Sequence, residues 1–71
     1  MRNKNFGTAP FAVCHWDTFD GDTFLVAEAL TLEEAVQKVN KIYKDRIRPN
    51  GADRVDIIDK NGEVVRSFGV G

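Results

Sequence analysis

Cysteine and histidine are almost absent from this 71-residue chain, which contains one of each, Cys14 and His15. A single cysteine excludes an internal disulfide and a cysteine-cluster zinc site. A free thiol is typical of proteins in a reducing compartment, so we expect the cytoplasm. Without disulfides or a structural metal, so small a domain must be stabilised by packing or by a partner subunit.

Long hydrophobic runs are lacking as well. No segment approaches the roughly 18 apolar residues that a membrane span requires. The first five residues, Met1 to Asn5, are mostly polar, whereas a signal peptide has an apolar core near its start. We therefore expect neither a membrane anchor nor export.

Glycine-rich phosphate loops are missing, because neither G-x-x-x-x-G-K nor G-x-G-x-x-G occurs in the chain. We expect no nucleotide and no other cofactor. An acidic turn follows His15, but its spacing departs from the calcium-loop template, so a solvated turn is predicted and no metal. The acids of this turn are Asp17, Asp20 and Asp22.

The adjacent pair Cys14 and His15 is the nearest approach to a catalytic motif, since an imidazole can activate a thiol. Both lie in a predicted strand, where neighbouring side chains point to opposite faces. A buried cysteine and a surface histidine are predicted instead. We assign no catalytic residue and do not expect an enzyme.

The composition, 42% hydrophobic and 30% charged, is that of one globular domain. A chain of this length hides roughly 60% of its unfolded surface, which leaves little room for a deep cleft. Residues 1–9 are polar and predict a flexible arm, and residues 10–70 predict the domain.

Two hairpins flanking one helix are predicted. Apolar runs at 11–16 and 23–27 surround an Asp-Gly turn, and runs at 55–59 and 63–68 surround an Asn-Gly turn. Between them, Thr31 and Glu34 form a capping box, and apolar residues recur every three or four positions, which predicts a helix over 32–47. The fold class is therefore α+β of ββαββ type, with one helix on one face of a four-stranded sheet.

The order 2-1-3-4 would make every neighbouring strand pair antiparallel and place the most apolar strands centrally, although 1-2-3-4 and 2-1-4-3 also connect without crossings. The Thr-Leu-Glu-Glu-Ala helix start and the Val-x-Ile-Ile-Asp-Lys-Asn-Gly-Glu-Val-Val hairpin resemble small uncharacterised bacterial domains of ββαββ type. The resemblance spans Phe11 to Phe68, supports the fold and implies no activity.

Both faces of the first two strands carry apolar side chains, more than one helix easily covers. An exposed apolar patch is expected, and such patches mark association sites. The candidate interaction surface consists of Phe11, Val13, Phe24 and Val26. In the alternative, Phe6 folds across the open sheet face and Phe19 packs back over the first hairpin.

Charge is unevenly distributed, because no Lys or Arg occurs between Asn5 and Gln37 while basic residues dominate from Lys38 to Arg54. The candidate basic patch consists of Lys38, Lys41, Lys44, Arg48 and Arg54. The leading interpretation is a non-enzymatic protein-interaction module, a homodimer through the sheet face or edge being one form of it. Nucleic-acid binding through the basic patch is the alternative, which the net charge of −1 does not favour.

Overall fold

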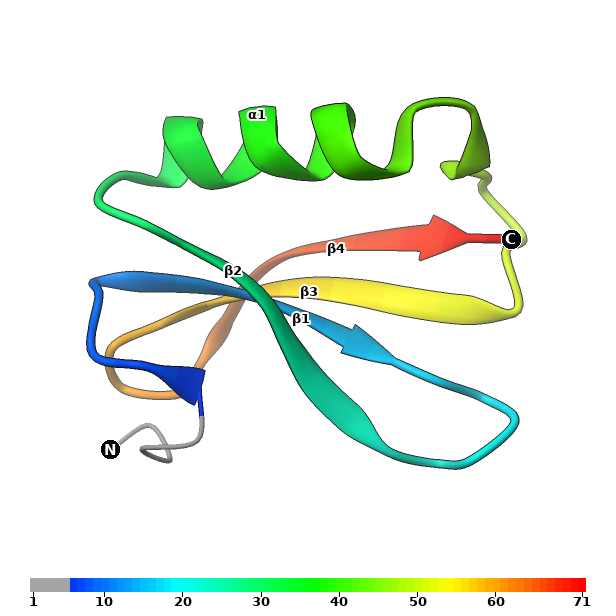
Figure 1. Ribbon diagram of the computed structural model, residues 1–71, viewed down its shortest axis with the longest axis horizontal. Helices are drawn as coiled ribbons and strands as arrows, with labels where there is room; N and C mark the ends of the chain where they lie inside the picture. The colour runs from blue at the N-terminus through cyan, green and yellow to red at the C-terminus, as the bar shows by residue number, and fades with distance from the viewer. Residues whose placement is uncertain (1–5) are drawn as a thin grey trace.

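The computed structural model describes residues 6–71 and has the predicted ββαββ fold (Figure 1). In chain order the elements are β1 (Phe11–Trp16), β2 (Thr23–Ala29), α1 (Leu32–Tyr43), the short 3₁₀ turn η2 (Lys44–Arg46), β3 (Asp53–Asp59) and β4 (Val64–Val70). No helix in this part of the chain is long and apolar enough to cross a bilayer.

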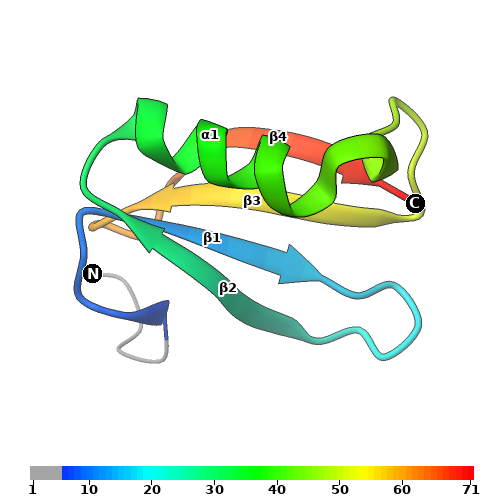
Figure 2. The same ribbon diagram turned by 45° about the horizontal axis from the view of Figure 1, so that its top comes forward.

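The sheet order is β2-β1-β3-β4 and every neighbouring pair is antiparallel, which confirms the favoured order. The two central strands, β1 and β3, each have four consecutive buried residues, whereas β4 begins with four exposed ones. One layer of sheet and one helix make up the domain, with α1 along a single face (Figures 1 and 2).

Helix α1 begins as predicted, because the Thr31 hydroxyl accepts a hydrogen bond from the Glu34 N–H at 3.1 Å. It ends at Tyr43, four residues before the predicted end. Lys44 has a positive φ of 35°, and Ile47 is drawn away to bridge Val70 at the end of β4. The periodic spacing of Ile47 therefore reflected a contact with the sheet and not a further helical turn.

The main core lies between α1 and the sheet. The fully buried side chains include Val13 of β1, Val39 of α1, and Val55 and Ile57 of β3. The other buried members of this cluster are Ala29, Ala35, Tyr43 and Val70. These residues come from every element that faces the helix, so one apolar layer joins both hairpins.

A smaller cluster lies on the opposite sheet face, where Phe6 and Leu25 pack on buried side chains. The buried members are Ala12, Cys14 and Ile58. The Thr8 and Ala9 N–H groups also donate to the Glu28 carboxylate, at 3.0 and 3.1 Å. Phe6 thus covers part of this face, as the alternative predicted. The rest of the predicted arm, residues 1–5, lies outside the described residues.

Candidate interaction site

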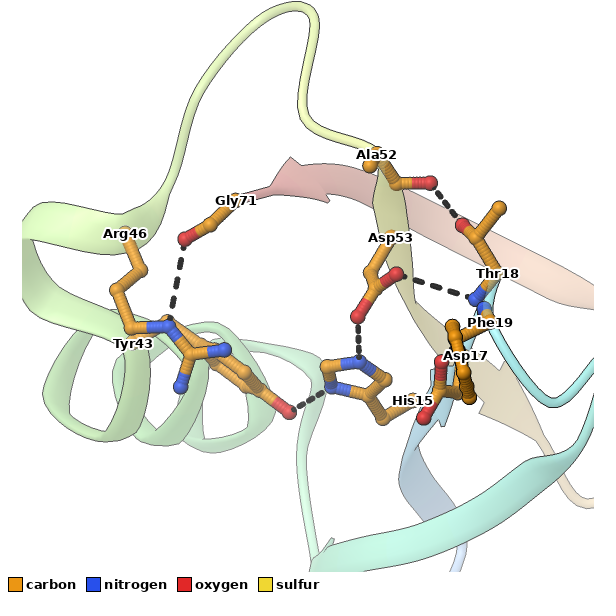
Figure 3. A network of polar contacts seen from close by, with 9 residues as sticks. All are labelled: His15, Asp17, Thr18, Phe19, Tyr43, Arg46, Ala52, Asp53 and Gly71. Carbon is orange, nitrogen blue, oxygen red and sulfur yellow. Dashed lines mark hydrogen bonds and ion pairs between the residues drawn. The ribbon is translucent and has the colours of Figure 1, made fainter.

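Three polar side chains, two of them buried and one half-buried, form a network where the C-terminal end of α1 meets the sheet (Figure 3). The Nδ1 atom of His15 lies 2.8 Å from the Tyr43 hydroxyl, and its Nε2 atom lies 2.9 Å from Asp53 Oδ2. His15 is only 6% exposed and Tyr43 only 4%. The network therefore joins β1, α1 and β3 through a single imidazole.

The partners of His15 determine which nitrogen carries the proton. A carboxylate only accepts hydrogen bonds, so Nε2 donates to Asp53. In the neutral ring Nδ1 is then an acceptor, and it receives the Tyr43 O–H. Both ring nitrogens are satisfied without a buried charge on the imidazole, and Phe24 stacks on the ring at 5.1 Å between centroids.

The environment shifts the pKa of both partners. The hydrogen bond from His15, followed by that from the Thr18 N–H, holds the pKa of Asp53 below its ordinary value. Burial raises the pKa of the Tyr43 phenol. The Arg46 guanidinium, 5.4 Å from the Tyr43 ring centroid, opposes that rise, and the Asp53 charge adds to it.

A tyrosine, a histidine and an aspartate can together relay a proton, but here the two ring systems are almost completely covered. No pocket opens beside them within residues 6–71. The hydrogen bonds of His15 to Tyr43 and Asp53 join three elements of the fold, β1, α1 and β3.

The network continues into the β1–β2 loop, residues 17–22, through the second oxygen of Asp53. Asp53 Oδ1 accepts a hydrogen bond from the Thr18 N–H at 3.1 Å, and the Thr18 hydroxyl donates to the Ala52 carbonyl. Three bonds within the loop complete its support: Phe19 N–H to Asp17 Oδ1 (2.8 Å), Gly21 N–H to Asp17 O (2.7 Å) and Asp17 N–H to Asp22 O (2.8 Å). The loop is thus fixed at its base and along its turn.

Phe19 lies in this supported loop and is 94% exposed, more than any other large hydrophobic residue described. It does not pack over the hairpin, so that part of the alternative prediction was wrong. Phe24, at the start of β2, is 49% exposed. Asp20 and Asp22 are also exposed. We call residues 17–22 together with Phe24 the loop end.

The predicted interaction surface is corrected by the structure. Val13 is completely buried beneath α1, and Phe11 and Val26 pack against the same core. The alternation of side chains along each strand placed these residues on one face of the sheet, but that face is the one which the helix covers. Only Phe24 retains substantial exposure, so the four residues do not form an exposed patch.

The predicted basic patch is divided between surfaces. Lys38 donates to the Glu28 carbonyl at 2.5 Å and lies 3.5 Å from the Glu34 carboxylate. Arg54 lies on the sheet face opposite α1, since its neighbour Val55 is in the main core. There its Nε donates to Asp56 at 2.9 Å, and its guanidinium covers the Trp16 ring.

Lys41, Lys44 and Arg48 remain exposed cations on α1 and the segment that follows it. Because Arg54 belongs to the other face and Lys38 has an acidic neighbour, the five cations do not share one surface. This corrects the prediction of a single basic patch, and it leaves nucleic-acid binding without the continuous stripe on which that alternative depended.

Cys14 and His15 diverge as predicted: Cys14 is buried in the smaller cluster and His15 faces α1. The prediction of a surface histidine was wrong. Among the described residues, no group of three His, Cys, Asp or Glu side chains is placed to hold a metal ion. No protein family, curated protein or solved structure matches the chain.

Proposed function

We propose that this chain is a protein-interaction module whose contact surface is the loop end. The observation that carries the proposal is the 94% exposure of Phe19 on a loop held by five hydrogen bonds. A large aromatic side chain that lies in water on a hydrogen-bonded loop has the character of an interface anchor, because aromatic residues are enriched at interface centres.

The support of the loop matters energetically. Fully burying a Phe side chain is worth about 1.5 to 3 kcal/mol, whereas immobilising a flexible side chain on binding costs about 0.5 to 1.5 kcal/mol, besides the ordering of the loop itself. The bonds from Thr18 to Ala52 and Asp53 order the loop before any partner arrives. More of the burial energy of Phe19 is therefore available for association.

The sheet edges are less suited to association. Each edge strand carries a register irregularity, opposite Val13 and Cys14 in β2 and opposite Ile57 and Ile58 in β4. Such bulges disturb the ladder that a further strand would extend. In addition, Lys38 donates a hydrogen bond to the Glu28 carbonyl of β2, and Ile47 forms a β-bridge with Val70 at the end of β4, so both edges already have partners there.

Site-specific photo-crosslinking tests the proposal. A photoreactive phenylalanine analogue at position 19 is expected to form a discrete adduct in extract of the source cells. Excess wild-type chain should compete for that adduct, and the Phe19→Ser chain should not. Leu30, which is 70% exposed at the other end of the domain, is the matched control position. Equal competition by both chains, or equal adducts from positions 19 and 30, would contradict a specific surface.

A further inference from the structure

We infer that the partner of the loop end is a second copy of this chain, in a two-fold symmetric contact that pairs acidic and basic groups. The inference rests on the proposed function and names its partner. Two clusters of opposite charge lie at the same end of the domain, one in the β1–β2 loop and one in the segment that follows α1 (Figure 1). The acidic cluster is Asp20 and Asp22, and the basic cluster is Lys44, Arg46 and Arg48, with the exposed acid Asp45 among them, so the segment 44–48 keeps an excess of positive charge.

The two clusters are neighbours because the β1–β2 loop and the α1–β3 connection both end there (Figures 1 and 2). Thr18 joins the loop to the end of that connection by bonding Ala52 and Asp53. Within residues 6–71, the ion pairs are His15–Asp53, Lys38–Glu34 and Arg54–Asp56. Neither Asp20 nor Asp22 therefore pairs with a cation of its own described chain, and all five charged residues are exposed.

Such a face is complementary to itself. A two-fold axis between two copies places the acidic cluster of one against the basic cluster of the other, twice. The whole chain carries a net charge of only −1, so two copies have little overall repulsion to overcome. Phe19 lies in the acidic loop, where approach of a second copy would remove its ring from water. Charge would set the orientation, and the aromatic ring would supply apolar burial.

The dimensions of the domain limit the strength of this contact. The principal extents of the backbone are 28, 25 and 15 Å, so the loop end offers only one small face of the domain. A contact confined to such a face lies at the low end of the interface sizes, near roughly 1,200 Å² of total buried surface, that stable complexes have. We therefore expect a weak dimer, with a Kd on the order of 10⁻⁵ to 10⁻³ M.

Charge reversal provides the test. One variant carries Asp20→Lys and Asp22→Lys, and the other carries Lys44→Glu and Arg48→Glu; Arg46 is kept because it covers Tyr43. Each variant has like charges on both clusters and should sediment as a monomer at concentrations where the wild type dimerises. Their equimolar mixture should dimerise again, because each altered cluster then meets its opposite.

Overall charge is controlled by a third variant, Lys60→Glu with Arg66→Glu, which makes the same charge change on the second hairpin, away from the loop end. It should retain self-association and should not dimerise with the Asp20→Lys, Asp22→Lys variant. Association of the wild type should weaken in 1 M salt, where the screening length falls to about 3 Å. Phe19→Ser should weaken dimerisation at least tenfold, whereas Leu30→Ser should leave it unchanged.

A wild-type chain that stays monomeric into the millimolar range at low salt, or a mixture that does not dimerise, overturns the two-fold contact. If adducts from position 19 nevertheless form in extract and yield to wild-type competition, the interaction module stands with a different partner. If the adducts and the self-association are both absent, the inference and the proposed function fail together.

Discussion

Replacing Tyr43 with phenylalanine should destabilise the domain although the ring and its packing are retained. The substitution removes the O–H group from which Nδ1 of His15 accepts a hydrogen bond at 2.8 Å, and His15 is only 6% exposed, so water cannot easily replace that donor. Leaving a buried acceptor unsatisfied costs about 1 to 2 kcal/mol. A domain of this length has a free energy of unfolding of roughly 4 to 10 kcal/mol, so the loss is a substantial fraction.

Thermal unfolding measured by circular dichroism should show the Tm of Tyr43→Phe lowered by roughly 5 to 15 °C. The matched experiment repeats the change in a His15→Leu background. There no nitrogen acceptor remains, and Tyr43→Phe removes a hydroxyl that has itself lost its partner, so the change should be neutral or stabilising. An unchanged Tm in the wild-type background, or the same loss in both backgrounds, would refute the assignment of this hydrogen bond.

Two further predictions follow from the pKa shifts. Tyr43 is the only tyrosine in the sequence, so the absorbance of tyrosinate reports its ionisation directly. Because burial raises the pKa of Tyr43, the midpoint of this titration should lie above 10 in the folded chain and near 10 in denaturant. The stability that this shift confers is present below pH 10 and is lost as the pH rises through the pKa of Tyr43 in the folded chain. A titration midpoint at or below 10 in the folded chain would contradict the burial of the phenol. Asp53 has a lowered pKa in the fold, so its contribution is present above about pH 4 and lost as the pH falls through the folded value. Urea unfolding should therefore show a gap in stability between the wild type and Asp53→Asn that narrows below pH 4, and a gap independent of pH would argue against the network.

Local sequence signals predicted the elements of the fold well. The Thr31 cap and the glycines of the two turns determine where the helix and the hairpins begin and turn, and Gly21 and Gly62 both have positive φ. The bounds of the elements were predicted less well, because β2 and β4 each end two residues later than predicted, β3 begins two residues earlier, and the helix ends four residues earlier. Ile47 continues the helical spacing, but its contact with Val70 is made across 23 residues of chain, and no local pattern reveals that competition.

The candidate site was less accessible to sequence reasoning. Alternation grouped Phe11, Val13 and His15 on one strand face, but it did not say which face the helix covers. One signal could have identified the network. If Val13 is buried, His15 on the same face is close to burial as well, and a buried imidazole needs partners for both nitrogens. Tyr43 follows Val39 at helical spacing, which places it on the same helix face, so only the carboxylate partner had no local signal.

The two oxygens of Asp53 connect the interior of the domain to its candidate contact surface. Oδ2 accepts from the buried imidazole and Oδ1 accepts from the Thr18 N–H at the base of the exposed loop. A network that only fastened the helix to the sheet would need no bond to that loop. Because the same carboxylate serves both, the base of the loop is joined directly to the buried imidazole. The hydrogen bonds of the loop support the backbone at Phe19, and such preorganisation lowers the cost of ordering a loop when a partner binds.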